Sequence, residues 1–283
     1  MLLSACNERI IVSDTEFTGL KYKVKTLNER FYIAQNSFDS LILQKKIYEH
    51  KYEFDNNCRY KSIEKQLFHS EKASEHDSTY VQDSIKRDSI QNPFPHAFKE
   101  PEYCLTEYTY VSDSVTVLKI YNKNRELMNY VNKKYKNNKL ISEENYSASD
   151  RLISKTGFWY APNGKLTNKT VFYDGNYSEI RYRYSTGKKL EIDNEYRYGF
   201  EFDINGNLTD KKTYKGVSPV CETHFYYNEY NDLIMTQDIG NDGNVMKTLY
   251  EYVYDSKNNW TTCVEYNHTG NIFVRTREIT YYD

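Results

Sequence analysis

An interval of six residues recurs along this chain and restricts its fold more than any other feature. In Tyr196–Leu208, YRYGFEFDINGNL, aromatic and polar residues alternate as far as Phe202, and Leu208 follows six positions later across an Asn-Gly turn. Alternate residues of a β-strand share one face, so Phe202 and Leu208 can lie on the same side of a hairpin. The segment therefore predicts two antiparallel strands joined by a five-residue turn.

The same interval separates two apolar residues at many other places. The pairs are Phe54/Tyr60, Tyr121/Leu127, Tyr146/Leu152, Tyr160/Leu166, Tyr184/Leu190, Phe202/Leu208, Tyr214/Val220, Tyr227/Leu233, Ile239/Val245, Tyr254/Trp260 and Tyr266/Ile272. Turns at such regular spacing are typical of all-β structure. A pair of hairpins buries little by itself, and stacking onto neighbouring hairpins supplies the stability.

The fifth position of each unit indicates the turn geometry. It holds the two residues that best tolerate a left-handed backbone, at Gly164, Gly206, Gly243, Gly270, Asn231 and Asn258. This predicts a type I turn followed by a left-handed residue in a G1 bulge. In the remaining units the position holds Cys58, Arg125, Asp150, Lys188 and Ser218. There we expect either another turn geometry or a different strand register.

These patterns predict one elongated antiparallel meander of repeated hairpins, in an open or partly rolled sheet with two exposed edges. Residues 20–68 are its N-terminal hairpins, and residues 101–283 are the main repeat sheet. Residues 69–100 are rich in Ser, Asp, Glu and Lys and end near several prolines, which predicts a polar loop or linker. Residues 1–19 are interpreted as a leader remnant and tether.

Tyrosine is the most informative part of the composition. The chain has 30 tyrosines and a net charge of −2, from 38 basic and 40 acidic residues. Tyrosine favours strands, and it buries a large ring while its hydroxyl stays hydrogen-bonded or wet. The charge balance argues against a nucleic-acid binder, which carries a basic surplus or patch. We therefore expect no nucleic-acid partner.

The chain opens MLLSAC, and Leu3-Ser4-Ala5-Cys6 resembles the lipobox of bacterial lipoproteins. The resemblance implies a lipid anchor on Cys6 and a place in the cell envelope, at the outer membrane or facing the periplasm. Residues 1–5 are shorter than a complete signal peptide, so either the leader was trimmed or the start was assigned late. The alternative is a cytoplasmic protein in which the pattern is coincidental.

The repeat units resemble a known family. Phe202, Asp203, Gly206-Asn207 and Leu208 match the YD repeats of Rhs-type and teneurin-type proteins. The match extends to Tyr254, Asp255, Asn259 and Trp260, with Asn258 in place of Gly. The chain is more similar still to small YD-repeat lipoproteins of Bacteroides-like bacteria. The likeness covers about 120–283 well and 20–68 faintly. Large Rhs proteins wrap a toxin in a shell of repeats, and this chain has too few repeats for that function to be carried over.

No constellation of residues indicates catalysis, a cofactor or a metal, so we expect a protein that is not an enzyme. His69 and His76 are seven positions apart, whereas metal ligands on one helix face are usually three or four apart. No CxxC pair is present. Besides Cys6 the cysteines are Cys58, Cys104, Cys221 and Cys263. These four are either small apolar residues or disulfide partners whose connectivity the sequence does not reveal.

Three functions are consistent with these features. The first is an extracytoplasmic binding or scaffold lipoprotein that uses aromatic rows of the sheet for a protein or glycan of the envelope. Its expected ligand-facing residues are Tyr196, Tyr198, Tyr250, Tyr252 and Trp260, although such rows can equally form the core of a curled sheet. The second is an immunity or antitoxin-like interaction partner. The third is an envelope glycan hydrolase, which needs two carboxylates roughly 5–10 Å apart in a cleft.

Overall fold

The computed structural model describes residues 20–37, 40–68, 102–193 and 196–282. All regular elements in these ranges are β-strands that pair in one sheet. They are β1 (Val24–Ser37), β2 (Ser40–Phe54), β3 (Tyr60–Leu67), β4 (Tyr103–Ser112), β5 (Val115–Tyr121), β6 (Leu127–Lys136), β7 (Lys139–Ser147), β8 (Leu152–Tyr160), β9 (Leu166–Tyr173), β10 (Asn176–Ser185), β11 (Lys188–Asp193), β12 (Tyr196–Phe202), β13 (Leu208–Lys215), β14 (Ser218–Tyr227), β15 (Leu233–Gly240), β16 (Val245–Tyr254), β17 (Trp260–Tyr266) and β18 (Ile272–Tyr281).

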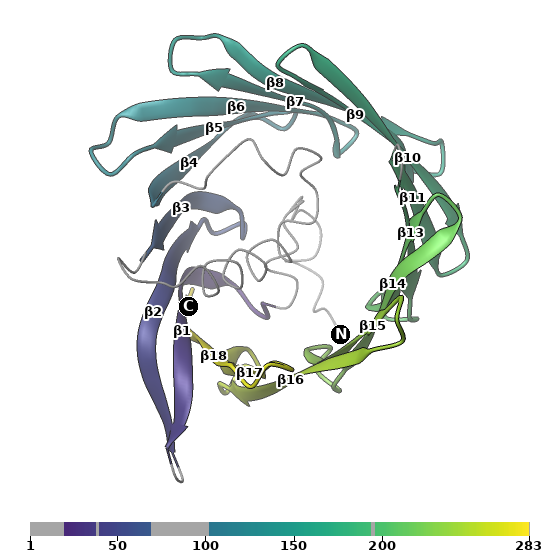
Figure 1. The fold of residues 1–283 in the computed structure, drawn as a ribbon. Coiled ribbons are helices and arrows are strands. Elements are labelled where there is room, and N and C mark those ends of the chain that lie inside the picture. The colour runs from purple at the N-terminus through teal and green to yellow at the C-terminus, as the bar shows by residue number, and fades with distance from the viewer. Residues whose placement is uncertain (1–19, 38–39, 69–101, 194–195, 283) are drawn as a thin grey trace, which may run out of the picture.

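The sheet is a closed antiparallel barrel of 18 strands (Figure 1). Each strand pairs with its neighbours in sequence, and β1 pairs with both β2 and β18. The β1–β18 seam runs from Val24 opposite Tyr281 to Ala34 opposite Ile272. The prediction of an all-β antiparallel meander is confirmed, but an open or partly rolled sheet is wrong. Pairing of the first strand with the last removes both exposed edges.

Strands from both predicted sheet regions belong to this single barrel. β3 pairs with β4, with Ser62 opposite Glu107, so residues 20–68 and 102–282 form one continuous wall. The predicted polar loop at 69–100 and the predicted tether at 1–19, including Cys6, lie outside the described residues. The histidines His69 and His76 lie outside them as well.

Most of the predicted hairpin pairs face each other directly. The confirmed pairs are Phe54/Tyr60, Tyr121/Leu127, Tyr146/Leu152, Tyr160/Leu166, Phe202/Leu208, Tyr227/Leu233, Ile239/Val245, Tyr254/Trp260 and Tyr266/Ile272. Tyr184/Leu190 and Tyr214/Val220 are not pairs of this kind. There Ser185 lies opposite Lys188, and Lys215 lies opposite Ser218, so each turn has only two residues.

The turn geometry is less dependent on glycine than the sequence suggested. Cys58, Arg125 and Asp150 have φ of 60°, 64° and 62°, so they adopt the left-handed conformation expected for Gly or Asn. The prediction of another geometry at these three positions is therefore wrong. In the first of these turns Asp55 N donates to Arg59 O at 2.8 Å, and Cys58 N donates to Asp55 O at 2.9 Å. Closing these two hydrogen bonds offsets the cost of the left-handed residue.

The Asp and Asn of the repeat motif hold the turn. The Asp203 carboxylate accepts from the backbone N–H of Asn207 at 2.8 Å and from its side-chain amide at 2.9 Å. Asp255 likewise accepts from the backbone N–H of Asn259 at 2.9 Å. These hydrogen bonds lower the pKa of Asp203 although burial acts in the opposite direction. The motif residues therefore have a structural role in the turn.

Tyrosine hydroxyls satisfy backbone carbonyls where the ladder between two neighbouring strands ends. The β13–β14 ladder ends at Asp210 opposite His224, and three residues further on Tyr227 donates its hydroxyl to Leu208 O at 2.9 Å. The same relation holds for Tyr110 to Tyr60 O, Tyr160 to Leu140 O and Tyr252 to Leu233 O. Phenylalanine would fill the same space but leave these carbonyls without that partner.

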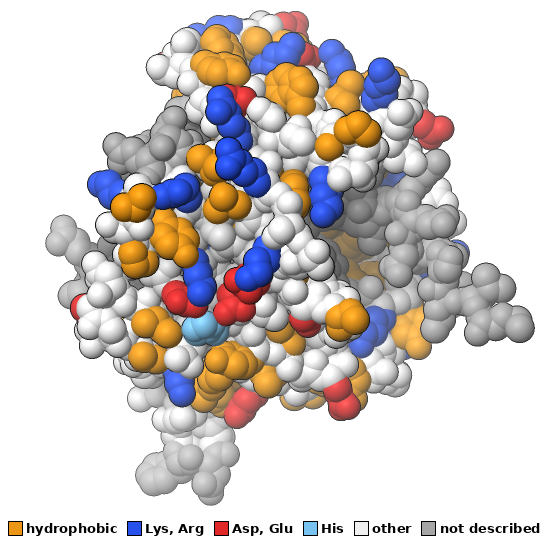
Figure 2. Space-filling model, turned by 90° about the vertical axis from the view of Figure 1, so that its right-hand side faces the viewer, with side chains coloured by type: hydrophobic (Ala, Val, Ile, Leu, Met, Phe, Trp, Pro, Cys, Tyr) orange, Lys and Arg blue, Asp and Glu red, His pale blue; other side chains and the backbone are white. Residues whose placement is uncertain are grey.

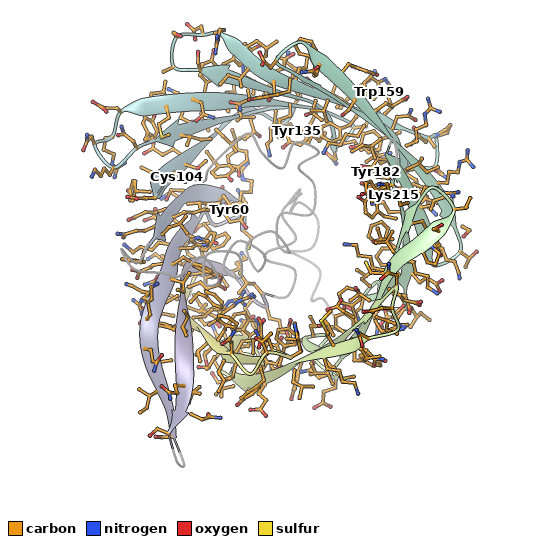
Figure 3. The ribbon with its side chains drawn as sticks, viewed as in Figure 1. Tyr60, Cys104, Tyr135, Trp159, Tyr182 and Lys215 are labelled. Carbon is orange, nitrogen blue, oxygen red and sulfur yellow. The ribbon has the colours of Figure 1, made fainter. Side chains whose placement is uncertain are left out.

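Alternate side chains face the interior and the exterior of the barrel. Tyr60, Tyr135, Tyr182 and Lys215 point inward, whereas Trp159 points outward (Figure 3). The most deeply buried inner side chains cluster where the first strands meet the last. They are Val24, Leu27, Phe31, Ile47, Tyr48, Tyr52, Phe54, Tyr60, Ile63 and Phe273. A separate small cluster of Ala34, Ile272 and Val274 lies on the opposite face of the same strands. The main hydrophobic core therefore lines the wall at the seam.

Candidate binding surface on the inner wall

The five aromatics predicted to face a ligand all lie on the inner wall, but in two separate groups. Tyr196 and Tyr198 lie on β12, where their rings stack with centroids 6.3 Å apart. Tyr250 and Tyr252 lie on β16, and Trp260 begins β17. The structure therefore does not bring the five residues together in one site.

The second group belongs to the packed core. The rings of Tyr252 and Trp260 lie 6.0 Å apart, and the Arg277 guanidinium lies 3.3 Å from the Trp260 centroid. Burial raises the pKa of Tyr252, whose hydroxyl donates to a backbone carbonyl. Tyr250 lies opposite Glu265, which is buried. These contacts are those of a packed, cation-capped aromatic core rather than of an open binding face.

The first group belongs to a more open stretch of inner wall, where lysines and aromatic rings alternate. We call it the lysine–aromatic wall, and it comprises Lys169, Tyr182, Lys189, Glu191, Tyr196, Tyr198, Phe200, Lys211 and Lys215 on β9 to β13. Figure 3 shows Tyr182 and Lys215 projecting inward from it. Most of these side chains are partly exposed, in contrast to the aromatics at the seam.

Ammonium groups lie against the rings of this wall. Lys189 Nζ lies 4.7 Å from the Tyr182 centroid and 5.0 Å from the Phe200 centroid. Lys215 Nζ lies 6.0 Å from the centroid of Tyr196. Such contacts hold a lysine near an aromatic face by cation–π attraction. The wall therefore presents both flat apolar surfaces and positive charge to the interior.

Basic residues outnumber acidic ones on this surface. The lysines are Lys169, Lys189, Lys211 and Lys215, and the acidic residue with a described side chain in the same register rows is Glu191. Glu191 is already paired with Lys189 at 3.3 Å. The wall therefore carries a local positive surplus on a chain whose charges nearly cancel overall. This surplus was not visible in the sequence because the lysines are spread over 47 positions and three strands, β9, β11 and β13.

Lys169 is the least expected member of the wall. Its side chain is only 9% exposed, and on the inner face it lies between Phe158 on β8 and Ile180 on β10. Within the part of the chain that the structure describes, the ammonium group of Lys169 makes no hydrogen bond or ion pair. Burial lowers the pKa of its ammonium group, while Glu143 and Glu191 act in the opposite direction. Lysine is rarely buried without a partner.

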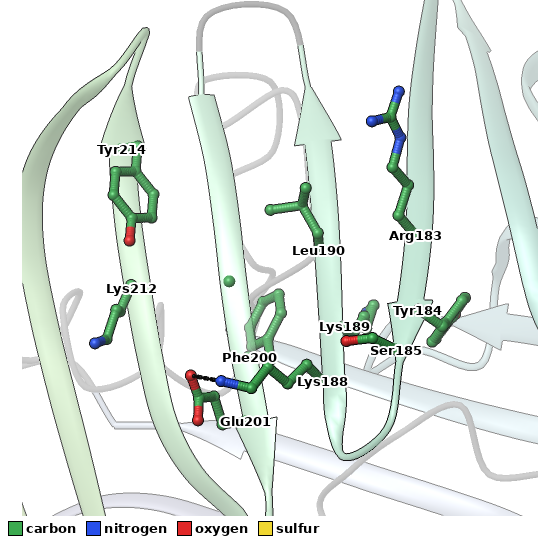
Figure 4. Close-up of a pocket in the computed structure, with 11 residues that line it drawn as sticks. Arg183, Tyr184, Ser185, Lys188, Lys189, Leu190, Phe200, Glu201, Lys212 and Tyr214 are labelled. Carbon is green, nitrogen blue, oxygen red and sulfur yellow. Dashed lines mark hydrogen bonds and ion pairs between the residues drawn. The ribbon is translucent and has the colours of Figure 1, made fainter.

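The outer wall has a groove around Gly199, the residue without a side chain in the alternating segment YRYGFEF. Gly199 lies opposite both Leu190 and Lys212 and lines a depression of about 350 Å³ across β10 to β13 (Figure 4). Its outward rim includes Arg183, Lys188, Leu190, Glu201, Lys212 and Tyr214. Lys188 Nζ pairs with Glu201 at 2.7 Å across the groove. No sequence motif predicted this groove. Its one sequence signal was Gly199, which interrupts the aromatic and charged residues of YRYGFEF.

Asp210, Glu222 and His224 cluster on the same outer face as this groove, in register with Lys212. Figure 2 shows a histidine among acidic and basic side chains on this side of the barrel. His224 Nδ1 lies 2.6 Å from Asp210 Oδ1, and His224 Nε2 lies 3.7 Å from Glu222 Oε1. Lys212 Nζ pairs with the same Glu222 oxygen at 2.8 Å. The three residue types can ligate a metal. Their atoms are already engaged with one another and with Lys212, which is the arrangement of an ion-pair row.

Ion pairs of this kind recur across the middle of the outer wall. Arg30 bridges Glu49 and Glu278 between β1, β2 and β18, at 2.8 and 2.6 Å. Glu144 on β7 pairs with Lys134 at 3.3 Å and with Lys155 at 2.8 Å. Opposite charges facing each other across strands help to fix the register. The outer wall therefore carries rows of ion pairs that link neighbouring strands.

The four cysteines in the described part of the chain form no disulfide. They are Cys58, Cys104, Cys221 and Cys263, of which Cys263 is buried and Cys221 is exposed. The described part of the chain contains no helix that could cross a lipid bilayer.

Comparison with known proteins gives only distant similarities. No family model matches the chain, and no curated protein matches it. Among solved structures it is similar to a porin-like protein from Bacteroides uniformis, with 11% identity, a TM-score of 0.47, and coverage of 91% of this chain and 98% of that one. A porin-like protein from Bacteroides vulgatus has 10% identity and a TM-score of 0.38, with 92% and 98% covered.

A third similarity is to a chain of the TcdB2–TccC3–Cdc42 structure. The identity is 10% and the TM-score 0.31, and the alignment covers 93% of this chain but 15% of that one. At these identities no activity is carried over from any of the three.

Proposed function

We propose that this protein is a binding protein of the bacterial cell envelope that holds its ligand against the lysine–aromatic wall. One observation carries the proposal. The inward aromatic rings of β12 stay partly exposed between the lysines of β11 and β13, whereas the rings at the seam are packed into a core. Flat rings beside fixed charges are a common composition of ligand sites, where apolar faces supply contact and polar groups supply orientation.

The ion-pair rows of the outer wall support an aqueous setting for the barrel. A lysine or arginine facing lipid at the middle of a membrane-spanning sheet costs about 2–4 kcal/mol. Arg30 and Lys155 occupy the middle of outward strand faces. We therefore propose attachment to the membrane through a lipid on Cys6, with the barrel itself in water.

The turn chemistry supports kinship with YD-repeat lipoproteins. Asp203 and Asn207, and likewise Asp255 and Asn259, form the hydrogen bonds that hold their turns. The residues that resemble the YD motif are thus the residues on which the hairpin depends. Because these residues act in the turns, the side chains of the strands between the turns can differ according to the ligand that is bound.

Glycan binding, measured by calorimetry on oligosaccharides that a glycan array identifies, tests the proposal. Tyr198→Ala and Phe200→Ala should each weaken binding at least tenfold, because each removes an aromatic face that contacts the ligand. Trp159→Ala is the matched control, because Trp159 is 50% exposed on the outer wall. All three variants should keep a cooperative thermal transition. Equal loss of binding in the Trp159 control would contradict a site on the inner wall.

The anchor is tested separately by membrane fractionation. Wild-type protein should sediment with envelope membranes, and Cys6→Ala should shift it to the soluble fraction. If both proteins are soluble in cells that process lipoproteins normally, the proposed envelope location is wrong.

The outer groove favours one alternative, a protein-interaction partner of the immunity type. Its rim combines Arg183, Lys188 and Lys212 with the apolar surfaces of Leu190 and Tyr214. In that case Lys212→Glu, and not Phe200→Ala, should abolish capture of the partner.

A further inference from the structure

Lys169 lacks a partner although acidic residues lie near it. The two carboxylates that act on its pKa are Glu143 and Glu191. Each is already paired with another lysine, Glu143 with Lys133 at 3.3 Å and Glu191 with Lys189 at 3.3 Å. The ammonium of Lys169 therefore stays uncompensated among the described residues. A buried charge without a partner is unfavourable, so an anion from outside would satisfy this group.

A second unsatisfied donor lies beside it on the same face. Ser178 lies two residues from Ile180, which pairs with Lys169, and its side-chain oxygen is buried without a hydrogen-bond partner in the described structure. The ammonium of Lys169 and the hydroxyl of Ser178 lie on adjacent register rows, so both can donate hydrogen bonds to one anionic group. Charge-assisted hydrogen bonds of this type are stronger than neutral ones.

Rings flank the two donors. Phe158 lies directly opposite Lys169 on β8, and Tyr182 lies two residues beyond Ile180 on the inner face of β10. Flat faces beside a cation and a hydroxyl suit a ring-shaped ligand that carries an acidic substituent. The positive surplus of the rest of the lysine–aromatic wall favours the same sign of ligand charge.

We infer that the lysine–aromatic wall binds an acidic saccharide, with the carboxylate or sulfate of one sugar held by Lys169 and Ser178. This inference rests on the proposed function and specifies its ligand class. Tyr198 and Phe200 contact the sugar chain further along the wall, and Lys211 and Lys215 pair with further acidic groups. A neutral chain of the same length keeps the ring contacts and loses the charged ones.

The test compares two probes with the same sugar backbone, tetragalacturonate and its uncharged, fully methyl-esterified form. Wild-type protein should bind the acid at least tenfold more tightly than the ester by calorimetry. Lys169→Met should remove that preference without weakening the ester, and Lys169→Arg should retain most of it. Lys155→Met is the matched control, because Lys155 lies on the neighbouring strand β8 but on the outer wall, paired with Glu144.

A stability measurement separates a ligand group from a structural one. Lys169→Met should melt at or above the wild-type temperature without ligand, because it removes an uncompensated buried charge. A large fall in melting temperature would show that Lys169 is held by a partner within the chain and would overturn the inference. A sulfated tetrasaccharide, tested in parallel, distinguishes sulfate from carboxylate as the preferred group.

The possible failures are distinguishable. If acid and ester bind equally and Tyr198→Ala weakens both, the proposed function stands and the acidic ligand class is wrong. If none of the probes binds wild-type protein, both are wrong. If Lys169→Met keeps the full preference for the acid, the assignment to Lys169 is overturned while the ligand class survives.

Discussion

The tyrosine hydroxyls show why this chain uses Tyr where Phe would fill the same volume. Each of the four hydroxyls described above donates a hydrogen bond to a backbone carbonyl beyond the end of a strand ladder, where no backbone N–H of the neighbouring strand pairs with it. A net hydrogen bond of this type stabilises a protein by about 0.5–1.5 kcal/mol. The high tyrosine content is therefore partly a consequence of how the hairpins are joined.

Tyr227→Phe should lower the free energy of unfolding by about 1 kcal/mol, because it leaves Leu208 O without its donor at 2.9 Å. Urea unfolding followed by circular dichroism measures the change. Tyr226→Phe is the matched control, since Tyr226 is adjacent in sequence but 40% exposed. An equal effect of the two substitutions would contradict this role of the hydroxyl.

His50 makes stability depend on pH. Its ring stacks on Tyr48 with centroids 4.3 Å apart, and burial, with Lys65 nearby, lowers the pKa of His50 to about 4. The folded state thus keeps His50 neutral, while the unfolded state binds a proton near pH 6.5. Stability is fully present above pH 6.5 and is lost as the pH falls towards 4, by at most about 3 kcal/mol.

Unfolding measured at pH 7 and pH 5 checks this expectation. His50→Gln should reduce the difference in unfolding free energy between the two pH values. His268→Gln should behave like wild type, because His268 is exposed in a hairpin turn. A pH profile unchanged by His50→Gln would show that other groups cause the acid sensitivity.

At the scale of the hairpin, backbone conformation and residue type disagree at a few turns. Arg125 has φ of 64°, a conformation that costs a non-glycine residue about 1 kcal/mol. Its exposed ion pair with Glu107 at 3.3 Å contributes little in return. At these turns the protein is less stable than it would be with the Gly or Asn that other repeat units have at the same position.

Arg125→Gly should therefore raise the free energy of unfolding by about 0.5–1 kcal/mol, the relief of strain being partly offset by greater freedom of the unfolded chain. Asn124→Gly is the control, because Asn124 has no positive φ, and it should bring no gain. Stabilisation by both substitutions, or by neither, would contradict this account of the turn.

The hairpins were largely predictable from the sequence, because a turn is a local feature. The six-residue interval between Phe202 and Leu208, for example, predicts both the length of the turn and the face that the two side chains share. The errors also have local causes. Gly187 and Gly216 form two-residue turns that shift the strand ends. At Cys58 the turn's hydrogen bonds outweigh residue preference.

At the scale of the molecule, closure and the site were beyond the sequence. A meander closes into a barrel only if its last strand comes to lie beside its first. This depends on the twist summed over all the strands, which no single residue indicates. The lysine–aromatic wall depends on register across β9 to β13 in the same way. Tyr196 and Tyr198 were predicted from their alternation, but Lys169 and Lys215 gave no signal.

A disulfide across the seam tests closure directly. Thr26 and Thr280 face each other on β1 and β18 with their hydroxyl oxygens 2.6 Å apart. Thr26→Cys with Thr280→Cys should form a disulfide on mild oxidation, which peptide mass spectrometry detects. Because it closes most of the chain into a loop, it should stabilise the protein by about 4 kcal/mol.

The control pairs Thr26→Cys with Glu278→Cys, two residues out of register, where diagonal neighbours lie too far apart to bridge. Closure would be refuted if the in-register pair stayed reduced or if both pairs oxidised equally slowly.

The seam also determines how the barrel would respond to a mechanical load. Val24 lies opposite Tyr281, and Tyr282 N donates to Lys23 O at 2.9 Å, so the two ends of the folded chain meet at one rim. Pulling these ends apart strains the hydrogen bonds between β1 and β18 one after another, as in a zipper. A pull directed along the strands would instead strain the whole row at once. We therefore expect the barrel to open at low force from its seam and to resist much higher force in the other direction.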